Sequence, residues 1–418
     1  MISTETSIPY KQPQNTAQLA ELAAFYGTPT YVYDERIIRR QCRLLKKHLK
    51  SVQTKLLYAM KANSHPAILN IIKSEGIGID AVSPAELYLA RRLGFAPEDI
   101  LYTANNMTDE EMHTIAKEGV LLNIGELSRV ARFGEAYPGS DVCVRLNPQI
   151  GSGHHAHVIT AGKSTKFGIP VGEKDEILKV AAKNNLNIVG LHQHIGSGIP
   201  SMEVLGQAIQ VILETAQHFP DLKILNLGGG FSIPYHPEDS TIDFENFQST
   251  IVSILANHAA TRDKSDLTYW FEPGRFLVAE SGTLLVTANT VKTANGKVYA
   301  GTDSGMNQLV RPSVYDAYHE IFNLSNPQGP RTSYEVVGNI CESGDVFARD
   351  RMIQRINEGD FLAIMDAGAY GMSMASLYNL RPMPAEVLIR EDGSHTNINP
   401  RISEKNLIDT MYGDYFAT

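Results

Sequence analysis

The sequence predicts an α/β protein with a TIM-like (β/α)8 barrel and a C-terminal β-rich domain of barrel or sandwich type. Apolar strand-like runs alternate with helix-like segments from about residue 54 to residue 280, and eight such runs fit a barrel of eight βα units. After residue 280 the pattern changes to strand-like runs separated by turn signals. A doubly wound open sheet is the alternative arrangement of the first part.

The expected barrel strands are short and mostly apolar. They cover residues 54–60, 78–83, 100–105, 121–125, 140–147, 187–195, 223–228 and 268–272. Between them lie amphipathic segments such as 85–93 and 203–217, whose apolar residues recur at the spacing of one helix face. Strands and helices are therefore expected to alternate through this part of the chain.

The region after the barrel carries the signals of antiparallel strands. Asn295-Gly296 stands between two strand-like runs and is a strong hairpin signal. Further strand-like runs follow at 361–368 and 385–390. The run at 29–34 precedes the barrel, and we expect it to pair with this C-terminal part.

The length of 418 residues suits two domains. The change of pattern predicts a domain boundary near residue 282 and a barrel domain over residues 35–282. Residues 1–34 and 283–418 together are expected to form the β-rich domain.

Composition and charge exclude several classes of protein. The formal net charge is -9 and the isoelectric point about 5.8, so the chain lacks the basic surface expected of a nucleic-acid or membrane-surface binder. No apolar run reaches the ~18 residues of a transmembrane helix. Small-molecule chemistry is therefore a better expectation than binding to a polymer or a membrane.

A cytoplasmic location is predicted from the cysteines. Cys42, Cys143 and Cys341 are few, odd in number and without paired spacing, which is typical of reduced thiols. The first residues, MISTETSIPYKQPQ, lack a basic stretch followed by an apolar one, so no secretory signal is expected.

Chemically distinctive residues follow the predicted strands. In a (β/α)8 barrel, functional groups collect at the carboxyl ends of the strands. The residues found there are Lys61, Ser83, Asn147, His194, Gly228-Gly229-Gly230 and Glu272. Six strand ends with such residues are more than a chance pattern would supply.

Lys61 and the glycine run each allow two interpretations. Lys61, in YAMKAN, is either the polar end of a strand or a lysine that forms a Schiff base with an aldehyde cofactor. The three glycines are either a flexible turn or a loop whose backbone N–H groups approach a phosphate. They do not match a complete nucleotide fingerprint.

Glu272 and His194 are similarly open. Glu272 and Arg275 either form an ion pair around a Pro-Gly turn, or supply a carboxylate for a pyridine nitrogen and an arginine for an anion. His194 is either a core histidine or a flat ring beside a cofactor.

A metal site is considered and not predicted. His192 and His194 are two apart on a strand and so point to one face, and His154, His155 and His157 lie close together in sequence. No cysteine or carboxylate at ligand spacing completes either set.

The ordered set of motifs resembles a known family. The motifs are YAMKAN, GIDAVSPAEL, STKFGI, GLHQHIGSG, NLGGGF, EPGRFLVAESG, CESGD and GAYGMSMASLYNLRP. Over about residues 28–390 the chain resembles the pyridoxal-phosphate decarboxylases built on an alanine-racemase-like barrel, and within them the diaminopimelate decarboxylases. No single motif is decisive, but their order is specific.

The resemblance implies a pyridoxal-phosphate site. It implies that Lys61 holds the cofactor covalently, that His194 stacks on its ring, and that Glu272 pairs with the pyridine nitrogen. The remaining cofactor-binding residues that it implies are Asp80, Arg145, Ser197, Gly228, Gly229, Gly230, Gly274, Arg275 and Tyr370.

The resemblance also implies a substrate site and a homodimer. The substrate-binding residues would be Arg275, Arg311, Tyr315, Glu342 and Tyr370. Cys341 would donate a proton to the product, although water beside it is the alternative. In this family the CESGD segment reaches the barrel of the partner subunit, which implies active sites at a subunit interface.

The far end of the substrate favours meso-2,6-diaminopimelate, converted to L-lysine and CO2. Arg311 and Tyr315 offer donors for a distal carboxylate, and Glu342 suits an ammonium. Alternative substrates are ornithine, lysine or carboxynorspermidine. A racemase on the same barrel and a regulatory homologue without cofactor are the remaining alternatives.

Overall fold

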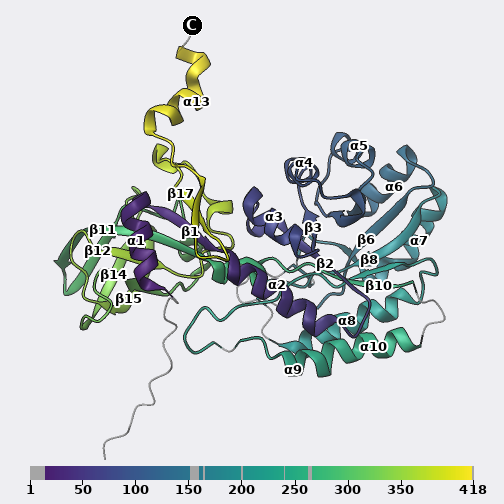
Figure 1. The fold of residues 1–418 in the computed structure, drawn as a ribbon. Helices are drawn as coiled ribbons and strands as arrows, with labels where there is room; N and C mark the ends of the chain where they lie inside the picture. The colour runs from purple at the N-terminus through teal and green to yellow at the C-terminus, as the bar shows by residue number, and fades with distance from the viewer. Residues whose placement is uncertain are drawn as a thin grey trace, which may run out of the picture. The chain divides into compact units, whose positions relative to one another are not determined.

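The computed structural model describes residues 15–150, 160–162, 165–198, 201–239, 241–261 and 266–416. The chain divides into two compact units, each of which is formed by more than one segment (Figure 1). The barrel unit comprises residues 39–233 and 241–277, and the β-rich unit comprises the segments up to residue 38, 234–240 and from residue 278 onward.

Eight parallel strands of the described residues close into a barrel. They are β2 (Thr54–Ala59), β3 (Gly78–Ala81), β4 (Ile100–Tyr102), β5 (Leu121–Ile124), β6 (Asp141–Asn147), β8 (Asn187–His192), β9 (Ile224–Asn226) and β10 (Thr268–Phe271). Their order is β5-β4-β3-β2-β10-β9-β8-β6, and the pairing of β5 with β6 closes the ring. A short strand, β7 (Ile169–Pro170), also pairs with β6. The predicted barrel is confirmed, and the open sheet is excluded by the closure.

Helices connect the barrel strands. They are α2 (Glu35–Leu49), α3 (Pro66–Ser74), α4 (Pro84–Arg92), α5 (Asp109–Lys117), α6 (Leu127–Ala136), α7 (Lys174–Lys183), α8 (Met202–Ala216), α9 (Phe244–Phe247), α10 (Ser253–Ala260) and α11 (Arg275–Val278). Short helical turns are η1 (Met60–Ala62), η2 (Pro97–Asp99), η4 (Val171–Glu173) and the π-helical η5 (Gln248–Val252). The predicted alternation of strand and helix is confirmed.

Hydroxyl side chains set where several of these helices begin. The Thr108 side chain accepts a hydrogen bond from the Glu111 N–H at 3.1 Å at the start of α5, and the Ser201 side chain accepts one from the Val204 N–H at 3.3 Å at the start of α8. Each of these bonds satisfies an N–H group that has no partner within the helix, which stabilises the helix end by about 1 kcal/mol.

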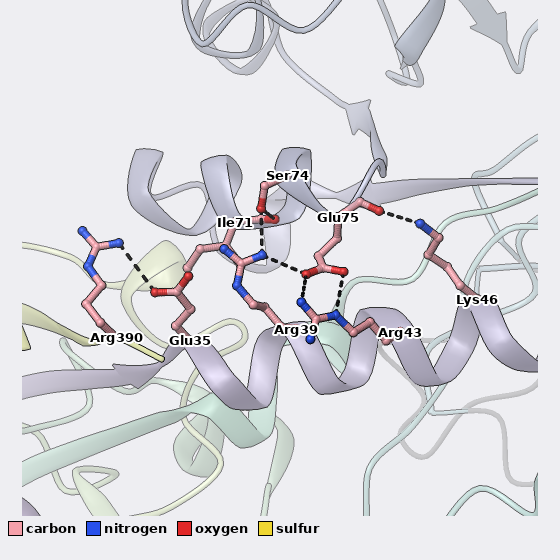
Figure 2. A network of polar contacts seen from close by, with 8 residues as sticks. All are labelled: Glu35, Arg39, Arg43, Lys46, Ile71, Ser74, Glu75 and Arg390. Atoms are coloured by element: carbon pink, nitrogen blue, oxygen red, sulfur yellow. Dashed lines mark hydrogen bonds and ion pairs between the residues drawn. The ribbon is translucent and has the colours of Figure 1, made fainter. Parts of the chain in front are cut away.

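Helices α2 and α3 are joined by a carboxylate with several basic partners (Figure 2). The Glu75 carboxylate, directly after α3, accepts hydrogen bonds from two arginines of α2. Arg39 donates one at 2.8 Å, and Arg43 donates two at 2.8 and 3.1 Å. Lys46 donates to the Glu75 carbonyl oxygen at 2.7 Å. Arg43 binds both carboxylate oxygens, a geometry that is stronger and more specific than a single contact. These bonds hold the carboxyl end of α3, the helix that follows Lys61, against α2.

The β-rich unit contains a nine-stranded sheet. Its strands are β1 (Thr30–Asp34), β11 (Gly282–Ala294), β12 (Lys297–Thr302), β13 (Ile321–Asn323), β14 (Arg331–Val337), β15 (Val346–Gln354), β16 (Phe361–Ile364), β17 (Ala385–Ile389) and β18 (His395–Asn399). The main order is β15-β14-β12-β11-β1-β17-β18, and β16 pairs with β11 and β13. The helical elements are α1 (Thr16–Tyr26), α12 (Arg311–Tyr315), α13 (Glu404–Phe416), η6 (Ala279–Ser281), η7 (Met372–Met374) and η8 (Tyr378–Leu380).

Two expectations about this unit are confirmed. Strand β1 pairs antiparallel with β11 and parallel with β17, so the segment before the barrel completes the C-terminal sheet. Asn295 and Gly296 connect β11 to β12 with positive φ angles of 50° and 77°. Two residues with positive φ are what a type I′ hairpin requires.

An apolar layer holds α1 on this sheet. Leu19 and Leu22 of α1 pack in one cluster with Val32 of β1, Leu285 of β11 and Val387 of β17. These contacts use one face of the helix and one face of the sheet, the usual way for such layers to bury apolar surface. Over the described part of the chain, no helix is both long and apolar enough to cross a membrane.

Gly78 at the start of β3 tests how tightly the barrel is packed. A Cβ at this position would lie 2.3 Å from the Asp99 carbonyl oxygen and 2.6 Å from Leu57 Cδ2. We expect Gly78→Ala to lower the free energy of unfolding by about 1–3 kcal/mol, the usual range for overpacking. Urea denaturation measures this change.

Gly172→Ala is the matched control, because a Cβ at Gly172 meets nothing within 4 Å. Its free energy of unfolding should stay within about 0.5 kcal/mol of the wild type. Equal effects of the two substitutions would contradict the close approach at Gly78.

Candidate active site

The carboxyl ends of the barrel strands bring charged side chains together. Lys61 lies in η1, directly after β2, and its Nζ is 3.8 Å from Oδ2 of Asp80 in β3. Glu272 follows β10, and Arg145 lies in β6. Asp80, Arg145 and Glu272 are buried, whereas 44% of the Lys61 side chain is exposed. A partly open lysine therefore stands beside an enclosed set of charges.

Glu272 is held by residues from β9, which pairs with β10, and from β8, which pairs with β9. The Asn226 Nδ2 amide donates to Glu272 Oε1 at 2.7 Å, and His192 Nε2 lies 3.0 Å from Glu272 Oε2. Burial raises the pKa of Glu272, while Lys61, the Asn226 hydrogen bond and Arg145 oppose that rise. Both carboxylate oxygens are thus engaged within hydrogen-bond distance.

The charge state of His192 fixes its role in this contact. Burial lowers the pKa of His192 well below its usual value, and the positive charges of Arg145 and Lys61 lower it further. His192 is therefore neutral, and toward an ionised Glu272 its Nε2 carries the proton and donates it. In the structure, Nε2 of His192, one of the two histidines considered as a metal pair, faces the Glu272 carboxylate.

Asp80 and Arg145 complete the buried charges. Burial and the Glu272 charge raise the pKa of Asp80, and Lys61 lowers it. Asp80 Oδ1 has no hydrogen-bond partner in the structure. The Arg145 guanidinium lies 4.7 Å from the centre of the Phe167 ring, within the range of a cation–π contact. Asp80 thus holds its proton more tightly than an exposed aspartic acid, and Lys61 and Arg145 supply positive charge beside Asp80 and Glu272.

The glycine loop passes directly against the ends of two strands. A Cβ at Gly228, which has a φ of +72°, would lie 2.4 Å from the Gln193 carbonyl oxygen. A Cβ at Gly229 would lie 2.3 Å from the Glu272 carbonyl oxygen. Only glycine fits at Gly228 and Gly229. The loop therefore packs closely against the backbone of two strand ends and is more than a flexible turn.

The same loop orients His194. The Gly229 N–H donates to His194 Nδ1 at 3.2 Å. Burial first, and then the positive charge of Lys61, lower the pKa of His194 well below its usual value, so the ring is neutral. Three residues after His194, the Ser197 hydroxyl accepts a hydrogen bond from Arg275 Nη2 at 3.1 Å. The ring, the hydroxyl and the guanidinium all belong to the barrel unit.

Gly274 packs against the segment that carries Lys61. A Cβ at Gly274 would lie 3.2 Å from Ala59 Cβ and 3.3 Å from Ala62 Cβ, on the two sides of Lys61 in sequence. The turn after Glu272 and the turn after β2 are therefore in contact.

Two of the strand-end residues have structural roles. β3 ends at Ala81, earlier than predicted, and the Ser83 hydroxyl caps α4 by accepting from the Glu86 N–H at 3.2 Å. Asn147 does end β6, but its Oδ1 accepts from the N–H groups of Gln149 and Gly162, at 2.8 and 3.0 Å. Strand β8 also ends early, at His192.

The remaining candidates lie in the β-rich unit. Arg311 and Tyr315 are the first and last residues of α12, and Arg311 is buried. Cys341 and Glu342 lie exposed in the loop after β14. Tyr370, with a positive φ of 57°, precedes η7.

The Cys341 loop is fixed by a buried carboxylate. Asp345 accepts hydrogen bonds from the N–H groups of Ile340 at 2.7 Å and Met306 at 2.6 Å. The Cys341 N–H donates to Asn379 Oδ1 at 2.9 Å. The exposed thiol and the Glu342 carboxylate are thus carried by an anchored turn.

The sequence analysis did not identify Asn226 as a site residue, and it considered His192 only as a possible metal ligand. Both residues contact the Glu272 carboxylate. Asn226 is the polar residue in the apolar run before the glycines, and it is fully buried. A buried amide in such a strand needs a partner, and this signal was available. His154, His155 and His157 lie outside the described residues, among which no group of three or more possible metal ligands occurs.

Known proteins share this architecture and sequence. A model of the pyridoxal-binding domain of pyridoxal-dependent decarboxylases matches residues 35–279. Diaminopimelate decarboxylase of Methanothermobacter thermautotrophicus is 42% identical over 90% of each chain, and that of Escherichia coli is 33% identical over 93% of each. This chain belongs to the diaminopimelate decarboxylase family.

Solved structures of this family match the decarboxylase fold. A crystal structure of a diaminopimelate decarboxylase has a TM-score of 0.86 at 32% identity, covering 94% of this chain and 96% of the other. The Helicobacter pylori diaminopimelate decarboxylase complexed with L-lysine also has a TM-score of 0.86, at 30% identity, with coverage of 94% and 99%. The chain is therefore a pyridoxal-phosphate-dependent decarboxylase.

The residues of this decarboxylase fit pyridoxal phosphate. The glycine loop, which leaves no room for side chains, suits a phosphate, and Ser197 and Arg275 add a hydroxyl and a positive charge. The buried Glu272 suits a protonated pyridine nitrogen, and Lys61 suits the aldehyde.

The raised pKa of Asp80 predicts a pH-dependent stability of the cofactor-free decarboxylase. Because the folded state holds this proton more tightly than the unfolded state, stability falls as pH rises from about 4 toward the raised pKa. Asp80→Asn removes this contribution. We expect the free energy of unfolding of Asp80→Asn, relative to wild type, to increase over that interval in urea denaturation.

Asp392→Asn serves as the control of opposite sign. Hydrogen bonds from Ser394 lower the pKa of the exposed Asp392, so its contribution to stability is present at higher pH and lost as pH falls. A relative stability of Asp80→Asn that does not change with pH would contradict the proposed burial cost.

Proposed function

We propose that this enzyme decarboxylates meso-2,6-diaminopimelate to L-lysine and CO2, the last step of lysine biosynthesis. The observation that carries the proposal is the buried Arg311, a cation suited to a second substrate carboxylate, in a chain 42% identical to a diaminopimelate decarboxylase. Ornithine and lysine have no such carboxylate beyond their reacting end.

The barrel residues prepare the reacting end. Pyridoxal phosphate, when bound, accepts the electrons left by the departing CO2. Lys61 would hold its aldehyde covalently until the substrate amine takes its place. Asn226 and His192 contact the two oxygens of Glu272 and hold its carboxyl group in place, where it would pair with a proton on the pyridine nitrogen. A protonated nitrogen is what makes the ring a strong electron acceptor.

Other residues hold the cofactor in place. His194, which accepts a hydrogen bond from the Gly229 N–H, would stack on the ring, and Asp80 and Arg145 would support the site around Lys61 and Glu272. The proposed phosphate-binding residues are Ser197, Gly228, Gly229, Gly230, Gly274, Arg275 and Tyr370.

A second set of residues is proposed to bind the far end of the substrate. Arg275, Arg311 and Tyr315 bind the distal carboxylate, with Tyr370 beside them. Glu342 binds the distal ammonium. The Cys341 thiol returns a proton to the carbon that loses CO2, which suits its exposed position on an anchored turn.

The active site is proposed to be shared between the subunits of a homodimer in the cytoplasm. The exposed Cys341 and Glu342 are suited to enter the barrel of the partner subunit. The functional domains proposed are the cofactor-binding barrel at 35–282 and the β-rich domain at 1–34 and 283–418.

Release of CO2 from a panel of amino acids tests the substrate. The wild type, loaded with pyridoxal phosphate, should act on meso-diaminopimelate and leave L-ornithine, L-lysine and carboxynorspermidine unconverted. Arg311→Ala should lower kcat/KM for diaminopimelate by about 100-fold, because a charged hydrogen-bond donor is lost.

Arg349→Ala is the control, since its side chain is exposed in β15 and pairs with Glu335 at 3.6 Å. Turnover of ornithine in preference to diaminopimelate would overturn the substrate assignment and leave the decarboxylase chemistry.

Mixing two inactive variants tests the shared site. Lys61→Ala lacks the covalent lysine, and Cys341→Ala lacks the thiol. If each site takes these residues from different subunits, refolding the two variants together should restore about a quarter of wild-type activity, since half of the random dimers contain one intact site.

Refolding each variant alone is the control and should restore nothing. An inactive mixture that contains mixed dimers by mass spectrometry would show that both residues act within one subunit.

A further inference from the structure

Arg311 lies in a compact cluster with Tyr235 and His319, here called the arginine cluster. Arg311 Nη1 lies 2.9 Å from His319 Nε2, and the guanidinium carbon is 4.6 Å from the centre of the Tyr235 ring. The Tyr235 and His319 rings meet edge to face at 5.7 Å. All three residues belong to the β-rich unit. The imidazole of His319 thus contacts an N–H group of the guanidinium, and the Tyr235 ring contacts the guanidinium face.

The hydrogen bonds of His319 determine which of its nitrogens carries the proton. Nδ1 lies 2.7 Å from the Met365 carbonyl oxygen, which can only accept. Nδ1 is therefore the protonated nitrogen, and Nε2 presents a lone pair to the N–H of Arg311. A second proton on Nε2 would place two donors against each other. The cluster thus requires a neutral His319.

A neutral acceptor suits an arginine that must still bind an anion. A carboxylate in the place of His319 would cancel the guanidinium charge and compete with a substrate carboxylate. An imidazole nitrogen fixes one edge of the fork and leaves its positive charge in place. The Tyr235 ring adds a cation–π contact, which restrains the plane.

The surroundings of His319 keep the imidazole in place. His319 is fully buried. Arg351 Nη1 donates to the His319 carbonyl oxygen at 2.7 Å, and the Arg351 guanidinium stacks on Tyr318 at 3.7 Å. The centre of the His236 ring lies 4.1 Å from the centre of the Tyr318 ring. Tyr235 thus packs against His319, and His236 packs against Tyr318.

We propose that His319 is a positioning residue for substrate specificity, which orients the Arg311 guanidinium toward the distal carboxylate, with Tyr235 holding its plane. This inference rests on the proposed function, because it needs a substrate with a carboxylate at that end. His319 itself acts through Arg311 and does not take part in the bond changes.

Two polar replacements of His319 separate its two hydrogen bonds. Gln places an oxygen near the position of Nε2 and so keeps an acceptor for Arg311. Asn places its amide near Nδ1, so it keeps the donor to Met365 and withdraws the acceptor. The pair therefore differs mainly in the contact that the proposal needs.

Steady-state kinetics with meso-diaminopimelate, and inhibition by L-lysine and by cadaverine, test the inference on the loaded enzyme. L-Lysine keeps the distal carboxylate, and cadaverine has none. His319→Asn should raise KM and the inhibition constant of L-lysine about tenfold, with kcat much less affected and cadaverine inhibition within about twofold. His319→Gln should recover most of the loss.

His395→Asn is the matched control, because His395 also binds through Nδ1, to the Tyr26 hydroxyl at 2.8 Å, and also contacts aromatic rings. The inference would be overturned if His319→Asn kept wild-type constants, if it weakened L-lysine and cadaverine alike, or if His319→Gln were equally impaired. A wild type without turnover of diaminopimelate would instead overturn the proposed function, and this inference with it.

Discussion

The enclosed carboxylate of Glu272 is the constraint on which the barrel site depends. An ionised group removed from water is costly unless it is paired and hydrogen-bonded. Here the two bonds come from the adjacent strands β9 and β8, because Asn226 and His192 face each other in register. Strand β10 pairs with β9, so three residues distant in sequence meet at this end of the barrel.

The other buried charges follow from that carboxylate. Lys61 and Arg145 supply positive charge near Glu272, and Asp80 lies beside Lys61. Removing Glu272 would take away the opposite charge that most favours the charged form of the buried Arg145. The glycine loop has a similar dependence, since its backbone passes the Glu272 and Gln193 carbonyl oxygens where no side chain fits. Charge balance and backbone proximity thus specify one arrangement.

Much of this organisation could be predicted from the sequence, because it depends on local signals. Short apolar runs gave the barrel strands, Asn295-Gly296 gave the hairpin, and the residues after the strands included Lys61 and Glu272. Errors arose where two local signals competed. The strand pattern around Asp80 continued to Ser83, although Ser83 and Glu86 have the spacing of a helix cap.

Contacts between distant segments could not be predicted in this way. The bond from Asn226 to Glu272 depends on strand order and register, which no single run encodes. The arginine cluster depends on a segment that leaves the barrel after β9 and packs against residues 318–319. Side-chain tautomers, such as that of His319, follow only from the atoms around them. Patterns therefore identified candidate groups, and the fold determined their partners.

The division of the chain has a consequence for how such a protein can be altered by recombination. The backbone passes between the two units four times, at residues 38/39, 233/234, 240/241 and 277/278. Neither unit is encoded by one uninterrupted stretch of gene, so no single crossover between two homologous genes can exchange one whole unit and leave the other unchanged. The stretch from 228 to 240 joins the glycine loop to Tyr235 within one short exchangeable piece. Changes in cofactor binding and in the support of Arg311 would therefore be inherited together.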